Sequence, residues 1–357
     1  MKSKKAKQTE QAISRPCENP NFFGHEDALQ TMFAAHRDGN MPGAWLISGP
    51  RGIGKATLVY RFIKFILYNS AKSEGFFGQS IPNADLSIPA TSPVFSKVSI
   101  GSHPDILVLE AGSENSKSTS GDILVDDARR VGSFLHLTAS ETPYRIVIID
   151  SIDDMNTNAA NSILKLLEEP PQNAMFFLIS HASGRLLPTI KSRCRQIKMR
   201  GLGGNNAIKV LQSIVPDITD AEATKLIELA SGSPGCAYDL YINKGLEIYA
   251  NIINIFSNLP RMSIQEIQKL GDSISGKNNE EYWRVTKILL NKIIVDITKN
   301  AAQLNNKSDI SGIKLAIGVE KLVDIWEEIN NLLEDADNLH LDRKAVLVKI
   351  FALFAGK

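Results

Sequence analysis

The chain of 357 residues has few cysteines and no long apolar run. Its three cysteines, Cys17, Cys194 and Cys236, lie far apart and are odd in number. They therefore predict neither a disulfide framework nor a metal-ligand spacing, and their scarcity suits a reducing compartment. No apolar run reaches the roughly 18 residues that cross a bilayer, so the sequence predicts no membrane span. We expect a cytoplasmic protein.

A strong excess of one charge is also absent. The formal net charge is +1, from 40 basic and 39 acidic residues. A protein that coats nucleic acid through bulk charge would be more basic, so any contact with DNA should be local or made through partners. The first eight residues are rich in lysine but lead into no apolar segment, unlike a secretory signal. We interpret residues 1–20 as a flexible tail.

The most informative stretch reads Ser-Gly-Pro-Arg-Gly-Ile-Gly-Lys-Ala-Thr, from position 48 to 57. Gly49, Gly54 and Lys55 match the G-x-x-x-x-G-K pattern of a phosphate-binding loop, in which backbone N–H groups and the lysine contact phosphate oxygens. The apolar residues 44–47 predict a strand before this loop, and residues 56–68 predict a helix after it. A glycine-rich turn without any ligand is the alternative interpretation.

The position after Lys55 departs from this pattern, because it holds Ala56. A phosphate loop normally carries a hydroxyl there, which binds Mg²⁺. Thr57 cannot replace it directly, since one residue along a helix turns the side chain by about 100°. We therefore predict a degenerate nucleotide site that keeps the shape of the loop, with Gly52, Gly54, Thr57 and Asp150 as further candidate binding residues.

Beyond the loop, apolar strands alternate with helical patterns, which is typical of an α/β protein with a parallel sheet. Arg145 is followed by Ile-Val-Ile-Ile and Asp150, as in a strand buried on both faces. Ligands of such sheets bind beyond the carboxyl ends of the strands, so Asp150 and the Gly49 loop should meet at one edge. Residues 70–102 are rich in serine, proline and glycine and predict a loop or insertion. Further strands are expected at 106–109, 175–179 and 196–199, and helices at 27–37, 126–137, 158–168 and 185–192.

Strand signals end near Gly201, and the remaining residues are helical in period. The overall fold class is an α/β domain with a phosphate loop and a parallel sheet, followed by a small helical lid and an all-α C-terminal domain. We predict these three domains at residues 21–200, 201–245 and 246–357. The clearest helices are expected at 205–215, 220–230, 285–297, 313–333 and 343–354, the last capped by Asp342.

Four stretches in this order resemble the clamp-loader branch of the AAA+ ATPases. They are the phosphate loop, the strand that ends at Asp150, the sequence Leu-Leu-Glu-Glu-Pro-Pro at 166–171, and Ser-Arg-Cys at 192–194. The last two are specific in combination, and the resemblance extends over residues 20–355. It implies a DNA polymerase III clamp-loader subunit, part of an assembly that opens a sliding clamp and places it on primed DNA during replication.

The resemblance also implies roles for single residues. ATP binds at subunit interfaces in this family, and one subunit, the stator, has little or no ATPase activity and supplies an arginine to its neighbour. Ser151 stands where active members have a glutamate that orients water, and Gly235 stands where a sensor arginine is expected. Together with Ala56, these departures predict that this chain does not turn ATP over. Arg193 keeps its motif, which implies that it acts in trans on the ATP of a neighbouring subunit.

Other charged residues receive simpler interpretations. Glu168 and Glu169 are interpreted as a helix end before two prolines, not as paired catalytic carboxylates, and His103 is interpreted as a turn residue. Better-known family members carry a four-cysteine zinc module that follows the phosphate loop, but residues 56–149 contain no cysteine, so we predict no zinc. A basic stretch without acids is interpreted equally well as a solvated face or a phosphate-binding surface. It contains Arg185, Lys191, Arg193, Arg195, Lys198 and Arg200.

The favoured hypothesis is a non-hydrolysing subunit that requires no cofactor, although passive ATP binding remains open. Its expected partners are the ATPase subunits and a wrench-type subunit of the loader, with the sliding clamp and primed DNA contacted through the complex. Only the whole holoenzyme would be a DNA-directed DNA polymerase, a nucleotidyltransferase. The alternative is an active AAA+ ATPase, which requires Thr57 and Asp153 to replace the missing groups. A small-molecule P-loop kinase is disfavoured by Ala56 and by the long helical region.

Overall fold

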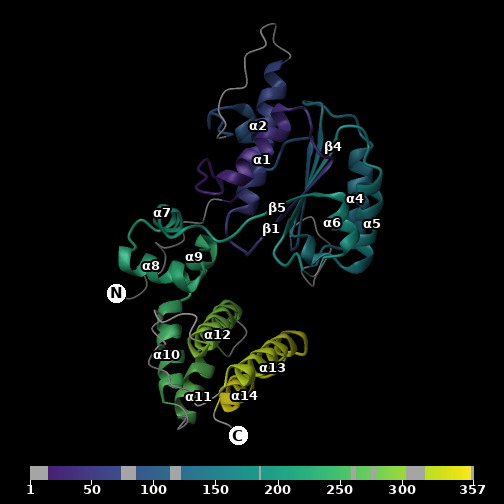
Figure 1. Cartoon of the computed structure of the whole chain (residues 1–357). Helices are drawn as coiled ribbons and strands as arrows, with labels where there is room; N and C mark the ends of the chain where they lie inside the picture. The colour runs from purple at the N-terminus through teal and green to yellow at the C-terminus, as the bar shows by residue number, and fades with distance from the viewer. Residues whose placement is uncertain are drawn as a thin grey trace, which may run out of the picture. The chain divides into compact units, whose positions relative to one another are not determined.

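The computed structural model describes residues 15–73, 86–112, 122–184, 186–258, 263–274, 279–302 and 318–354. The chain divides into two compact units, one that ends at Val210 and one that begins at Leu211. The first contains the sheet, and the described part of the second is helical (Figure 1). The three-domain boundaries expected at residues 200 and 245 stay predictions.

The first unit is built on a five-stranded parallel sheet in the order β2-β3-β4-β1-β5. Every residue of β1 and β4 is buried, as their near-continuous apolar runs predicted. This confirms the α/β fold class. Because the strands are parallel, their carboxyl ends share one edge of the sheet. The strands are β1 (Ala44–Ser48), β2 (Ile106–Glu110), β3 (Arg145–Asp150), β4 (Ala174–Ser180) and β5 (Arg195–Lys198).

Helices cover both faces of this sheet (Figure 1). Successive side chains of a strand point to opposite faces. Trp45 and Ile47 of β1 therefore join the core with α1, α2 and α3, whereas Leu46 joins the core with α4, α5 and α6. The bounds are α1 (Glu26–Arg37), α2 (Lys55–Ser73) and α3 (Pro93–Ser99) on one face, and α4 (Val125–Leu135), α5 (Thr157–Glu168) and α6 (Pro188–Arg193) on the other.

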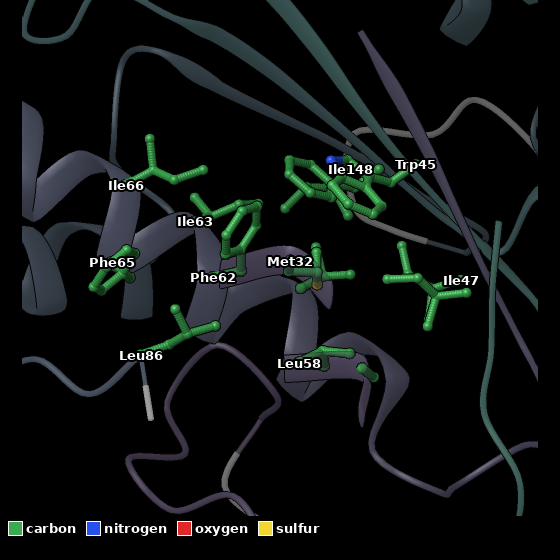
Figure 2. Close-up of a cluster of buried hydrophobic side chains, with 14 of the residues drawn as sticks. Met32, Trp45, Ile47, Leu58, Phe62, Ile63, Phe65, Ile66, Leu86 and Ile148 are labelled. Carbon is green, nitrogen blue, oxygen red and sulfur yellow. The ribbon is translucent and has the colours of Figure 1, made fainter. Parts of the chain in front are cut away.

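Phe62 of α2 lies in the middle of the first of these cores (Figure 2). Its ring meets Trp45 edge-on with the centroids 6.3 Å apart, and it meets Phe177 in the same way at 6.0 Å. All three side chains are completely buried. This packing holds α2 against the sheet, and it thereby sets the position of the first residue of the helix, Lys55.

Residues 70–102, which were predicted to be a loop or an insertion, are helical in part. Helix α2 continues to Ser73, and residues 93–99 form the additional helix α3. The side chain of Ser92 caps α3 by accepting a hydrogen bond from the N–H of Phe95, 3.2 Å away, and Pro93 occupies the first turn. Residues 74–85 of this segment lie outside the described residues, as do residues 113–121 after β2.

The helical unit agrees with the predicted helices where the chain is described. Asp342 caps the last helix as predicted, since its Oδ1 accepts a hydrogen bond from the N–H of Lys344 at 3.2 Å. The start of the predicted helix 313–333 lies outside the described residues, and the described helix continues to Asn338. No helix within the described ranges is long and apolar enough to cross a membrane. The helices are α7 (Gly204–Ile214), which spans the division between the units, α8 (Asp220–Leu229), α9 (Pro234–Ile242), α10 (Gly245–Ser257), α11 (Ile264–Ile274), α12 (Glu280–Ala301), α13 (Val319–Asn338) and α14 (Arg343–Phe354).

Candidate functional site

The phosphate-loop sequence forms the turn between β1 and α2, which is the structural context that the motif requires. Gly49, Gly52 and Gly54 all have positive φ angles, of 152°, 76° and 96°. A side chain at Gly49 would place its Cβ 2.2 Å from the carbonyl oxygen of Met199, so only glycine fits there. The backbone conformation of this turn therefore requires glycine at these positions.

The side chain of Lys55 is turned back onto this loop. Its ammonium group donates hydrogen bonds to the carbonyl oxygens of Gly49 and Pro50, each 2.6 Å away, and the residue is 3% exposed. Burial lowers the pKa of Lys55 to about 8, with a further contribution from Arg51, although nearby carboxylates oppose the shift. The ammonium group that contacts the terminal phosphates in a nucleotide-binding loop is thus hydrogen-bonded here to the backbone of the phosphate loop.

Asp150 lies at the carboxyl edge of the sheet with the phosphate loop, as predicted. Strand β4 separates β3 from β1, but Asp150 and Lys55 still influence each other's pKa. Burial and, to a smaller extent, Glu110, its register partner on β2, raise the pKa of Asp150 to about 6, although Lys55 opposes the shift. At neutral pH this carboxylate is ionised but weakly stabilised. In a nucleotide site a divalent cation, or the lysine that binds the phosphates, would normally stabilise the charged form of such a carboxylate.

The two acids that follow Asp150 are both bound to other protein groups. Asp153 accepts hydrogen bonds from the Ser180 hydroxyl at 3.0 Å and from the backbone N–H groups of residues 181 and 182. Asp154 accepts one from the Ser151 hydroxyl at 2.8 Å. Asp153 therefore joins the chain after β3 to the end of β4. The Ser151 side chain, at the position of the water-orienting glutamate, is engaged within its own turn.

Sequence reasoning missed His181, which follows directly after β4. Its Nδ1 is buried and has no hydrogen-bond partner among the described residues. Burial, with smaller contributions from the cations of Lys55 and Arg51, lowers the pKa of His181 to about 4. The one available signal was its position at the end of an apolar strand. His25 was also missed, and its Nε2 lies 3.0 Å from the carbonyl oxygen of Ile53 in the phosphate loop.

Thr57, the other candidate ligand, is half-buried on α2, and its role stays a prediction. His103 is buried, and its Nδ1 accepts a hydrogen bond from the N–H of Asp105, two residues away, at 3.2 Å. In the basic stretch Arg185 lies outside the described residues, and Lys191 is half-buried. The exposed members are Arg193, Arg195, Lys198 and Arg200.

Arg193 is the last residue of α6, and its side chain is 31% exposed. Its Nη2 donates to Oε1 of Glu168, the last residue of α5, and its Nη1 donates to the carbonyl oxygen of Thr189 at 2.9 Å. The prediction that Glu168 ends a helix is confirmed. The two motifs that were separate in sequence, Leu-Leu-Glu-Glu-Pro-Pro and Ser-Arg-Cys, are thus joined by an ion pair.

Comparisons with known proteins agree with these motifs. A family model described as DNA polymerase III, delta subunit, matches residues 24–203. The delta-prime subunit of Pseudomonas aeruginosa DNA polymerase III is 31% identical over 62% of each chain, and that of Escherichia coli is 29% identical over 60% of this chain and 58% of its own. The matched region is therefore less than two thirds of either relative.

More distant relatives carry other subunit names. The gamma subunit of Buchnera aphidicola from Schizaphis graminum is 24% identical over 83% of this chain and 73% of its own. A solved gamma subunit-related protein of Thermotoga maritima is 17% identical over 93% of this chain and 99% of its own, with a TM-score of 0.42, too low to support an argument. Because the family model covers residues 24–203, half of the chain, the protein belongs to the DNA polymerase III delta-subunit family, as a delta-prime-like member of the clamp-loader proteins.

Proposed function

We propose that this chain is the delta-prime subunit, or stator, of a DNA polymerase III clamp loader. In this proposal it does not hydrolyse ATP and supplies Arg193 to the ATP of a neighbouring subunit. The main support is the position of the Lys55 ammonium group, which is hydrogen-bonded to the carbonyl oxygens of its own phosphate loop. In addition, the partly exposed side chain of Arg193 lies at the end of α6 in the same unit.

The residues of the phosphate loop do not fit a magnesium–ATP complex that is hydrolysed in place. Such a complex requires a metal-binding hydroxyl, which Ala56 lacks, and a group that orients water, which Ser151 does not supply. Bound phosphate would also have to displace Lys55 from two short hydrogen bonds. We therefore propose that the chain requires neither ATP nor zinc as a cofactor.

The proposed partners follow from the family and from the different roles that we assign to the two units of the chain. The unit with the sheet would present Arg193 to an ATPase subunit. The helical unit, in whose described residues we identify no candidate catalytic group, would hold the chain in the loader. Contact with the sliding clamp and primed DNA would occur through the complex, consistent with the net charge of +1.

An active ATPase is the second hypothesis, because a gamma subunit is among the relatives. It requires Thr57 and Asp153 to replace the missing catalytic groups. The Asp153 carboxylate, however, accepts hydrogen bonds from the Ser180 hydroxyl and from two backbone N–H groups. Its release would break the connection to the end of β4, which makes this hypothesis the weaker one.

The first experiment measures steady-state ATP hydrolysis by the purified chain with magnesium present. We expect no turnover above that of the Lys55→Ala variant, which serves as the matched control. Turnover near one per second that disappears in this variant would exclude the stator and favour the active ATPase.

The second experiment places Arg193→Ala in the reconstituted loader. Hydrolysis at the one site that Arg193 serves should fall by roughly 10³ or more. The total ATPase activity of the loader should therefore fall by the fraction that this site contributes. The subunits should still elute together in size-exclusion chromatography. Arg200→Ala, also exposed in the basic stretch, is the control. Equal ATPase activity in the two variants would reject a role for Arg193 in trans.

A further inference from the structure

The ion pair between Arg193 and Glu168 connects two helix ends in the described part of the first unit. Glu168 closes α5 and Arg193 closes α6, and the two residues are 25 positions apart in sequence. The Arg193 side chain is 31% exposed and that of Glu168 is 48% exposed. The pair therefore lies at the surface, where another molecule can reach it.

The helix ends are held together by apolar packing that does not depend on the ion pair. Leu167 of α5, Ile190 of α6 and Cys194 after α6 are all buried in the same core cluster. Pro188 at the start of α6 restricts the backbone further. Removal of the Glu168 charge should therefore leave the position of Arg193 in the fold unchanged. It should alter only what the guanidinium group binds.

The hydrogen bonds of Arg193 limit what it can offer to a phosphate. A guanidinium group binds an anion bidentately through the edge formed by Nη1 and Nη2 or through the edge formed by Nε and Nη2. Nη2 contributes one N–H to each edge, and one of these two N–H groups donates to Glu168, while Nη1 donates to Thr189. In addition, the Glu168 carboxylate would repel a phosphate brought against the same guanidinium group. Glu168 and a phosphate are thus competing partners of Arg193.

We propose that Glu168 is a positioning residue that holds Arg193 on its own chain until a phosphate of the neighbouring nucleotide displaces the carboxylate. This inference rests on the proposed function of Arg193. Engagement exchanges one anionic partner for another and involves no covalent step. Because exposed ion pairs are weak, the competition should change the apparent affinity for ATP by about two- to fivefold.

The test uses Glu168→Gln in the reconstituted loader, with Glu169→Gln as the matched control. Glu169 is the next residue, is exposed, and caps α5 through its backbone. Glu168→Gln should lower KM for ATP by about two- to fivefold and leave kcat unchanged, because the competing carboxylate is gone. Glu169→Gln should match the wild type. The thermal unfolding temperature of each purified variant shows whether the fold is retained.

The same substitution in an Arg193→Ala background separates this inference from the proposed function. If Glu168 acts through Arg193, Glu168→Gln should have no effect on KM there. An effect that persists without Arg193 would overturn the inference, and so would a lower kcat, which would mean that the carboxylate supports the engaged arginine. If Arg193→Ala reduces the ATPase activity but Glu168→Gln equals Glu169→Gln, the inference fails while the proposed function stands. If Arg193→Ala itself has no effect, the proposed function fails.

Discussion

The ammonium group of Lys55 donates a hydrogen bond to the carbonyl oxygen of Gly49, 2.6 Å away, across the turn that joins β1 to α2. The same turn is tied to the neighbouring strands, since the N–H of Gly49 donates to Ser180 at 3.2 Å and the N–H of Met199 donates to Ser48 at 2.7 Å. The carbonyl oxygens of Gly49 and Pro50 and the N–H of Gly49 thus have partners within the protein.

We predict that Gly49→Ala destabilises the protein by about 2–5 kcal/mol. The added Cβ would lie 2.2 Å from the backbone oxygen of Met199, and the φ angle of 152° is unfavourable for alanine. Urea unfolding followed by circular dichroism measures the loss. Gly132→Ala is the control, because a Cβ at Gly132 of α4 would meet nothing within 4 Å. If both variants unfold at the same urea concentration, the close approach of the loop to the chain after β5 is refuted.

We predict that Lys55 makes the protein more stable as pH rises above 8. Burial lowers the pKa of Lys55 to about 8 in the folded state, whereas the ordinary value is about 10.4. Between these values the unfolded state binds more protons, so the free energy of unfolding increases with pH. Lys55→Met should remove this increase, which amounts to about 2 kcal/mol between pH 7 and 9.5.

The measurement is guanidinium unfolding of both proteins at pH 7 and pH 9.5. Lys198→Met is the control, since Lys198 is an exposed lysine on β5. This variant should show the same pH dependence as the wild type. A Lys55→Met protein that still follows the wild-type curve would show that the ammonium group is not buried in solution.

We predict that the Asp105 carboxylate stabilises the folded protein at the amino end of β2. Asp105 is completely buried, and its carboxylate accepts hydrogen bonds from the backbone N–H groups of Ser140 and Glu141 at 2.8 Å and of Thr142 at 3.1 Å. Asp105→Asn leaves one oxygen for these donors and should cost about 2–4 kcal/mol at pH 7. Asp126→Asn, at an exposed position of α4, should change stability by less than about 0.5 kcal/mol.

The effect of Asp105 should depend on pH in the acid range. Burial raises the pKa of Asp105, but the backbone N–H groups and Arg145 outweigh burial and hold the pKa below its ordinary value. The charged form therefore adds stability above about pH 4, and this contribution is lost as pH falls through the lower pKa of the folded state. The difference between wild type and Asp105→Asn in urea unfolding should thus shrink below pH 4. A difference that stays constant would contradict this account.

Local signals in the sequence were sufficient for most of the elements. The run Ile146–Ile149 indicated a strand buried on both faces, and Asp342 indicated the start of α14. Helix α3, within the segment predicted to be a loop or an insertion, also has a local signal. Ser92 followed by Pro93 is a typical helix start, with a capping hydroxyl before a proline in the first turn.

The types of most elements, the phosphate-loop turn and the family could be predicted from the sequence alone, because periodicity, glycine positions and motif spacing are local properties of the chain. The three-dimensional structure was needed to show that Lys55 turns back onto its own loop, that Lys55 lowers the pKa of His181, and that Glu168 binds Arg193. The last two of these relationships depend on the strand order, with β4 beside β1, and on the packing of α5 beside α6. Contacts between distant residues arise from burial of the shared cores, which no single stretch of sequence encodes.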